Sequence, residues 1–287
     1  MVAQFDPTRP RRSALYMPGA NARALEKART LDADTLLFDL EDAVAPDAKQ
    51  MAREQVRAAV RSGGYGAREI IVRVNGLQTP WGADDLAAIK GIGVDGVLIP
   101  KVNAPRDLDA AAERVAEEAL WAMMETPAGI GAAYDIARHP RLHVLVAGTN
   151  DLAKELHAAH VPGRAPLQTA LQLVLLAARS AGRGALDGVF NAIDDTDGFA
   201  AECMAGRDFG FDGKTLIHPS QIAPCNAIFA PTPAAIAEAR TIIAAFEAPE
   251  AKGVTTVNGK MVELLHVEDA RRLVARAEAI DARKAGA

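Results

Sequence analysis

Cysteine is nearly absent from this sequence, and so is any dense run of positive charge. The two cysteines, Cys203 and Cys225, match neither a CxxC motif nor a zinc-ligand spacing, which excludes a disulfide framework and a zinc site. No run of Lys or Arg is longer than Arg11 and Arg12, and the formal net charge is -5. Because this balance gives no attraction to polyanions, we expect no nucleic-acid partner.

Long apolar runs are also missing. A bilayer span needs about 18 consecutive apolar residues, and no uncharged stretch of that kind occurs. The opening MVAQFDPTRPRRS lacks the apolar core of a signal peptide. We therefore expect a cytoplasmic protein without a membrane partner.

Short apolar runs do alternate with helix-like segments along most of the 287 residues. The runs are continuous rather than alternating in polarity, which is typical of strands buried on both faces of a parallel sheet. They lie at 13–19, 35–42, 69–75, 96–101, 120–127, 143–151, 186–191 and 211–219, and the helix-like segments at 20–30, 46–62, 83–90, 105–118, 129–138, 165–181 and 196–206.

This succession of strands and helices predicts an α/β fold, a (β/α)8 TIM barrel. The alternative is an open doubly wound sheet, which needs fewer strands and usually a glycine-rich first turn. No GxGxxG follows any of the runs, so the barrel is favoured.

The pattern changes after the eighth run. Residues 233–248 and 264–283 are typical of helices, and 254–261 of an extended link with a turn at Asn258 and Gly259. We therefore assign 1–230 to a catalytic barrel domain and 231–287 to a C-terminal helical extension. Because such a tail has to bury its apolar face, we expect it to pack on a neighbouring subunit.

Nearly every predicted strand ends in a polar residue, and barrel enzymes place their active residues at these ends. In chain order these residues are Asp39, Glu41, Asp42, Arg73, Asn75, Lys101, Glu125, Asn150, Asp151, Asn191 and His218. The five carboxylates exceed the two cations by three charges if all are ionised. Since crowded carboxylates raise each other's pKa or recruit a counter-ion, we expect a divalent cation.

The candidate ligands are all oxygen atoms, which favours Mg²⁺, with Mn²⁺ as the alternative, over zinc. Mg²⁺ takes one or two protein carboxylates and fills its other positions with water and substrate oxygens. Glu125 and Asp151, at the ends of adjacent strands, suit this role. Asp39, Glu41 and Asp42 then surround the site as supporting groups, although Asp39 and Asp42 can instead be helix caps.

Two cations accompany these carboxylates. Arg73 lies inside the apolar run EIIVRVN, where an arginine is rarely buried unpaired. We favour an anion-binding role for it over a structural ion pair. Lys101 ends the run GVLIPK and is expected beside the carboxylates as a further supporting group.

Several longer motifs extend the pattern over nearly the whole chain. They are RRSALYMPGAN (11–21), TLLFDLEDAVAPDAK (35–49), IIVRVNGL with the following WG (70–82), IPK (99–101), ETPAGI (125–130), GFDGKTLIHPSQI (210–222), APT (230–232) and NGKMVE (258–263). Together they resemble the citrate lyase β-subunit group of the HpcH/HpaI aldolases, which includes malyl-CoA and citramalyl-CoA lyases.

The resemblance implies a magnesium-dependent enzyme that makes or breaks a carbon–carbon bond between a 2-oxo acid and the enolate of an acyl thioester. Citryl-, malyl- and citramalyl-CoA are the implied thioesters, with oxaloacetate, glyoxylate and pyruvate as the oxo acids. The family's metal ligands correspond to Glu125 and Asp151, of which Glu125 also contacts substrate, and its catalytic, carboxylate-binding arginine corresponds to Arg73.

The same resemblance implies a contribution from a neighbouring subunit, as homotrimers or hexamers are usual in the family. Glu263 stands where related lyases carry a catalytic aspartate in the tail. Arg12 and Lys27 are weaker candidates for the phosphates of coenzyme A. Two alternatives stay open: a citrate lyase β subunit that acts on a thioester of an acyl carrier protein, and a thioesterase.

Overall fold

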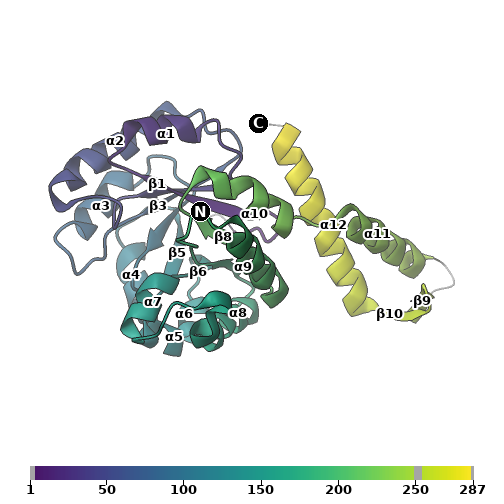
Figure 1. The fold of residues 1–287 in the computed structure, drawn as a ribbon. Helices are drawn as coiled ribbons and strands as arrows, with labels where there is room; N and C mark the ends of the chain where they lie inside the picture. Colours follow the sequence, from purple (N-terminus) through teal and green to yellow (C-terminus); the bar gives the residue numbers. More distant parts are fainter. Residues whose placement is uncertain (1–3, 249–253, 286–287) are drawn as a thin grey trace. The chain divides into compact units, whose positions relative to one another are not determined.

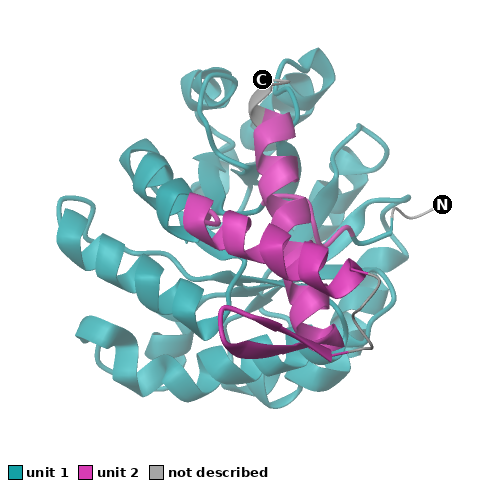
Figure 2. Ribbon diagram, turned by 90° about the vertical axis from the view of Figure 1, so that its right-hand side faces the viewer, with its two compact units in different colours: residues 1–5, 11–229 teal, residues 6–10, 230–287 magenta. Residues whose placement is uncertain are grey.

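The computed structural model describes residues 4–248 and 254–285 (Figure 1). The chain forms two compact units (Figure 2). The first consists of Arg11–Phe229 with the described residues before Asp6, and the second of Asp6–Pro10 with the described residues from Ala230 onward. The inclusion of Asp6–Pro10 in the second unit was not predicted, and packing of the tail on a neighbouring subunit stays a prediction.

Eight parallel strands close into a barrel in chain order, with β8 paired to β1. They are β1 (Ser13–Pro18), β2 (Thr35–Asp39), β3 (Glu69–Arg73), β4 (Gly96–Ile99), β5 (Ala119–Met124), β6 (Leu142–Ala147), β7 (Gly184–Asp187) and β8 (Gly213–Leu216). The TIM barrel is therefore confirmed, and the open doubly wound sheet is wrong.

Helices follow the strands and surround the barrel (Figure 1). They are α1 (Ala22–Ala28), α2 (Lys49–Ser62), α3 (Gly82–Ile89), α4 (Pro105–Ala112), α5 (Pro127–Gly131), α6 (Ala133–Ala137), α7 (Thr149–Glu155), α8 (Gln168–Ser180), α9 (Thr196–Phe209) and α10 (Ile222–Phe229), with short 3-10 turns η1 (Pro46–Ala48), η2 (Pro162–Leu167) and η3 (Pro219–Gln221). Helices α7 and α10 were not predicted; the start of α7 was assigned to the preceding strand.

The continuous apolar runs are explained by burial on both strand faces. Leu37 of β2 points into the barrel, where it packs in a cluster with Trp121. Its neighbours Leu36 and Phe38 belong to the larger cluster between strands and helices. Successive strand residues face opposite sides, so a run with no polar position is needed when both sides are covered.

The second unit consists of α11 (Pro233–Glu247), the hairpin of β9 (Val254–Val257) and β10 (Lys260–Glu263), and α12 (Leu264–Ala285). The predicted extended link is thus two antiparallel strands. Asn258 and Gly259 both have positive φ, at 53° and 75°, as a tight hairpin turn requires. Val257, Val262 and Val267 form a small core of this unit.

Across the two described ranges, no helix is both long enough and apolar enough to cross a bilayer.

Candidate active site

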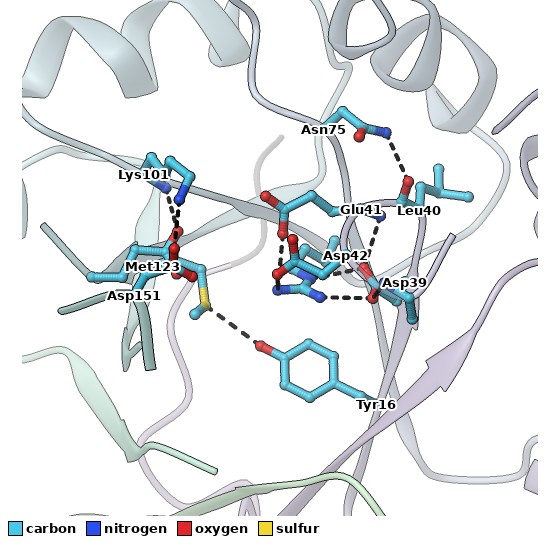
Figure 3. Close-up of polar contacts among 12 residues, drawn as sticks. Tyr16, Asp39, Leu40, Glu41, Asp42, Asn75, Lys101, Met123 and Asp151 are labelled. Carbon is cyan, nitrogen blue, oxygen red and sulfur yellow. Dashed lines mark hydrogen bonds and ion pairs between the residues drawn. The ribbon is translucent and has the colours of Figure 1, made fainter. Parts of the chain in front are cut away.

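A cavity of about 330 Å³ opens at the C-terminal ends of the barrel strands. It is lined by Tyr16, Asp39, Asp42, Ala43, Arg73, Met123, Glu125, Ala147, Gly148, Thr149, Asn150, Asp151, Val189, Asn191, Thr215 and Ile217. Most of the polar strand-end residues predicted from the sequence therefore meet in one place (Figure 3).

Arg73 is held by carboxylates on one side of this cavity. Its Nε and Nη2 donate to the two oxygens of Asp39, at 2.8 and 2.7 Å. Its Nη1 lies 3.2 Å from Asp42 Oδ2 and 2.9 Å from Glu41 Oε2. The guanidinium also stacks on Tyr16, 4.6 Å from the ring centroid. All three guanidinium nitrogens of Arg73 therefore contact acids, and one of the two partners of Nη1, Asp42, is exposed.

Asp39 organises the turn that follows β2. It is fully buried, and its carboxylate accepts from the backbone N–H groups of Glu41 and Ala43, at 2.9 and 3.0 Å. Lys49 also stabilises this turn. Its Nζ donates to the carbonyl oxygens of Leu40 and Glu41, both at 2.8 Å. Asp39 therefore caps a turn, not the helix that the alternative predicted, and it also binds Arg73.

Glu41 is a half-buried acid among other acids. Burial raises the pKa of Glu41 to about 8, and Asp42, Glu125 and Asp39 add to the rise, while Arg73 opposes it. Its Oε2 lies near Arg73 without the alignment of a hydrogen bond. At neutral pH the surroundings of this carboxyl group therefore favour its protonated form.

Lys101 links the two predicted metal ligands on the opposite side (Figure 3). Its backbone N–H donates to Glu125 Oε1 at 2.7 Å, and its Nζ donates to Asp151 Oδ1 at 2.9 Å. The residue has φ of 51°, a left-handed conformation that is costly for a side chain of this size. This conformation lets one residue contact both carboxylates.

Glu125 is buried and carries a shifted pKa. Burial raises the pKa of Glu125 to about 7, the Lys101 N–H opposes the rise, and nearby Asp151 adds to it. Gly148, just after β6, leaves space for this carboxylate: a Cβ atom there would lie 2.6 Å from Glu125 Oε2. The site thus keeps two acids close together where negative charge is unfavourable.

This arrangement fits a bound divalent cation. Among residues 4–248 and 254–285, no cluster of three or more His, Cys, Asp or Glu could hold a metal by itself. Mg²⁺ needs only one or two carboxylates beside water and substrate oxygens. Glu125 and Asp151 supply two that line one cavity.

Tyr16 and Lys49 were not singled out from the sequence, and the mutual contact of the predicted Asn150 and Asn191 was not foreseen. Tyr16 packs under Arg73, and the amides of Asn150 and Asn191 bond to each other at 2.8 and 3.2 Å. Lys49 lies in the motif LEDAVAPDAK, but nothing in the spacing shows that its ammonium reaches back to the turn. These contacts join residues distant along the chain.

The remaining predicted residues lie elsewhere. Arg12 is only 3% exposed and pairs with Asp34 at 2.8 Å before the first two strands, which is the opposite end of the barrel. Its prediction as a phosphate ligand does not fit this placement. Lys27 is exposed in the last turn of α1, Glu263 lies in β10 of the second unit, and His218 caps η3.

Asn75 also has a structural position. Its side-chain amide donates to the Leu40 carbonyl and to Asp85, at 2.8 and 2.6 Å. The residue is buried beside the turn after β2 and does not line the cavity.

Two family models match the chain. Residues 12–219 match the model described as HpcH/HpaI aldolase/citrate lyase, and residues 168–281 match a C-C bond lyase of the TIM-barrel fold.

Similar proteins cover almost the full length. A (3S)-malyl-CoA thioesterase of Cereibacter sphaeroides strain ATCC 17025 is 54% identical over 275 residues, which are 95% of this chain and 96% of the relative. Citrate lyase subunit beta of Escherichia coli strain K12 is 38% identical and covers 94% of either chain. The solved structure of CitE from Mycobacterium tuberculosis in complex with magnesium, acetoacetate and coenzyme A has a TM-score of 0.77 and 28% identity, over 93% of this chain and 97% of that chain.

Proposed function

Because the chain belongs to the HpcH/HpaI aldolase and citrate lyase family, we propose that it uses Mg²⁺ to cleave or form the carbon–carbon bond of a 3-hydroxyacyl thioester. Malyl-CoA is the first candidate, with citryl- and citramalyl-CoA as alternatives. Cleavage gives acetyl-CoA and a 2-oxo acid. The observation that carries this proposal is the meeting of Glu125, Asp151 and Arg73 in one cavity at the strand ends.

The two acids would hold the metal. When bound, Mg²⁺ supplies positive charge that binds substrate oxygens and lowers the pKa of the substrate hydroxyl. Glu125 has to be ionised for this, so its raised pKa makes metal binding compete with a proton. Lys101 would orient both carboxylates toward the metal, because its backbone N–H donates to Glu125 and its ammonium donates to Asp151.

Arg73 would stabilise negative charge on the substrate. Cleavage moves the electron pair of the breaking bond onto the thioester, which becomes an enolate, and a preplaced cation lowers the energy of that charge. Asp39 retains Nε and Nη2, so Nη1 is the donor free to leave Asp42 for a substrate oxygen. The planar guanidinium can contact both groups at once.

Cleavage turns the substrate hydroxyl into the carbonyl of the 2-oxo acid and releases its proton to solvent. The carbon of the enolate takes up one proton, so the reaction has no net change in protons. We assign the protonation of this carbon to Glu263 of a neighbouring subunit, because its carboxylate lies on the hairpin next to exposed apolar residues. Met261 is 61% exposed, and Leu264 and Leu265 are each 54% exposed. Such a surface is expected to be covered in an assembly.

Hydrolysis is the second candidate, favoured by the 54% identity to a protein named (3S)-malyl-CoA thioesterase. In that reaction water adds to the thioester carbonyl, the C–S bond breaks, and coenzyme A leaves as the thiol with malate as the acid. Incubation of the purified protein with Mg²⁺ and malyl-CoA distinguishes the reactions. Acetyl-CoA with glyoxylate supports the lyase, whereas free coenzyme A with malate and no glyoxylate supports the thioesterase.

A third arm of this experiment adds a citryl thioester of an acyl carrier protein. Turnover of the carrier thioester alone, with coenzyme A thioesters left intact, would support a subunit like citrate lyase subunit beta.

The metal assignment is tested by Asp151→Asn. We expect loss of turnover and of Mg²⁺ binding with an unchanged fold, because asparagine can still accept the bond from Lys101 but carries no charge. Asp135→Asn, an exposed acid on α6, is the matched control. Calorimetry with Mg²⁺ and steady-state kinetics measure both, and full turnover of the Asp151 variant at saturating Mg²⁺ would remove Asp151 from the site.

A further inference from the structure

A second cavity, of about 360 Å³, lies beside the first. The two share a wall made of Thr149, Asn150, Val189 and Asn191. The second cavity extends from this wall to α9, where Ala201 and Ala205 line it with small side chains. The space is therefore adjacent to the place where Asp151 would hold a substrate.

The shared wall can be opened by side-chain motion. Asn150 and Asn191 are both exposed and are joined across the wall by two amide hydrogen bonds, at 2.8 and 3.2 Å. A pair of exposed amides exchanges such bonds for bonds to water at little net cost. A substituent of the bound acid can thus pass between the two side chains.

The wall also contains a buried polar group without a partner. Thr149 is 4% exposed, and its Oγ1 makes no hydrogen bond within the described residues. Gly188 provides the room for this hydroxyl, since a Cβ atom there would lie 2.5 Å from it. A buried hydroxyl left unsatisfied is costly, which points to a ligand atom as its partner.

The charges around the second cavity are already paired. Arg164 donates to both oxygens of Asp187, at 2.6 and 3.0 Å, and Glu202 accepts from Lys214 at 2.7 Å. Asp195 caps α9 through the Gly198 N–H at 2.9 Å. Arg164, Asp195 and Glu202 are lining residues that together carry a formal charge of about -1. A second carboxylate would meet two acids, a cation already paired with Asp187, and the exposed imidazole of His160 here.

We propose that this second cavity binds an uncharged alkyl substituent of the 2-oxo acid portion of the substrate. The proposal rests on the proposed function and narrows its substrate class: acids with a hydrogen or an alkyl chain next to the carbonyl are accepted, and dicarboxylic oxo acids such as oxaloacetate are disfavoured. The Thr149 hydroxyl bonds the acid where its chain enters the wall.

The test is calorimetry of the full chain with Mg²⁺ and three acids: glyoxylate, 2-oxopentanoate and oxaloacetate. We expect 2-oxopentanoate to bind the wild-type protein at least as tightly as glyoxylate does. We expect oxaloacetate to bind about tenfold more weakly than 2-oxopentanoate, because its second carboxylate would lie near Asp195 and Glu202 while the lining arginine is already paired. Equal or tighter binding of oxaloacetate than of 2-oxopentanoate would overturn the proposal.

Substitutions that fill the second cavity test the proposal directly, with a matched control elsewhere on the barrel. Ala205→Phe should reduce affinity for 2-oxopentanoate about tenfold relative to glyoxylate, because the ring occupies the space of the chain. Ala201→Phe, at an exposed position of α9 that also lines the second cavity, is the second variant if Ala205→Phe does not fold. Ala58→Phe, exposed on α2, is the control and should leave the ratio unchanged.

These measurements distinguish failure of the proposed function from failure of the second cavity as a binding site. If glyoxylate does not bind the wild-type protein in Mg²⁺, the proposed function falls and the second cavity falls with it. If glyoxylate binds but 2-oxopentanoate does not, or if both filling variants leave the ratio unchanged, only the second cavity is wrong.

Discussion

Glu125 shows how one buried side chain couples metal binding to pH. Its pKa lies near 7 instead of 4.5, chiefly because burial disfavours the carboxylate. The folded protein therefore holds this proton more tightly than the unfolded chain does. Without metal, the stabilisation from this group is complete below pH 4.5 and is lost as pH rises through about 7.

A divalent cation should reverse that loss. We predict that Mg²⁺ raises Tm more at pH 8 than at pH 5.5, because at the lower pH the cation must displace the proton of Glu125. Thermal unfolding with and without Mg²⁺ at the two pH values measures the effect, with Glu125→Gln as the variant expected to lose it. Equal Tm shifts at both pH values would contradict the assignment.

Arg73 illustrates why the kind of cation matters. Asp39 binds two of its nitrogens, and Nη1 would have to exchange its contacts with Asp42 and Glu41 for a substrate oxygen. We predict that Arg73→Lys lowers kcat/KM on the order of 100-fold, because an ammonium cannot satisfy Asp39 with two donors and still reach the substrate. Steady-state kinetics measures the change.

The control for that variant is Arg138→Lys, at an exposed arginine paired with Asp135 on the barrel surface. Its kcat/KM should stay within about twofold, as exposed ion pairs contribute little. An Arg73→Lys enzyme that performs as well as this control would exclude the guanidinium from the reaction.

At the scale of elements, the junction of β6 and α7 decides the geometry of the site. The apolar run at 143–151 predicted one strand up to Asp151, yet β6 ends at Ala147 and α7 begins at Thr149. Asp151 thus lies in the first turn of a helix. The boundary was missed because apolar periodicity describes the strand but not the helix of seven residues that follows it.

Gly148 tests this junction. We predict that Gly148→Ala weakens Mg²⁺ binding about 10- to 100-fold, because the added methyl group would displace the Glu125 carboxylate from its place. Gly131→Ala is the control, since a Cβ atom there meets nothing within 4 Å and its φ is not positive. Calorimetry with Mg²⁺ on both variants measures the loss, and equal affinities would show that the turn adjusts freely.

At the scale of the whole molecule, the second unit is the part that we expect to contribute to the active site of a neighbouring subunit. The second unit has its own small core and leaves Met261, Leu264 and Leu265 exposed beside Glu263. If a neighbouring subunit completes each site, residues of one site come from two chains. The sequence and its resemblance predict this arrangement, and subunit mixing can test it.

We predict that coexpressed Asp151→Asn and Glu263→Gln chains recover activity that neither variant has alone, because some mixed sites combine an intact barrel with an intact tail. Differently tagged chains, purified together and assayed, provide the measurement. Coexpression of Asp151→Asn with Glu125→Gln, both on the barrel, is the control and should stay inactive. No recovery in a confirmed mixed oligomer would assign Glu263 to its own subunit or to no role.

The amino-acid sequence by itself determined the barrel and the identity of the acids at its open end. Both can be recognised in short stretches of sequence. A strand covered on two faces must be apolar throughout, and the acids at its C-terminal end directly follow the apolar run. The tertiary structure decided how those acids are used. Only closure of the barrel brings Lys101 between Glu125 and Asp151 and places Arg73 against Asp39.

The shifted pKa values and the second cavity also could not be predicted from the sequence, because both depend on contacts between residues that are distant along the chain. Burial of Glu41 and Glu125 depends on side chains from several strands, which no spacing along the chain specifies. The burial of Arg12 could not be predicted for the same reason. A basic residue near the N-terminus is expected on the surface, and its ion pair with Asp34 forms only in the folded chain. Contacts between distant residues are set by packing, and packing is settled only when the whole chain has folded.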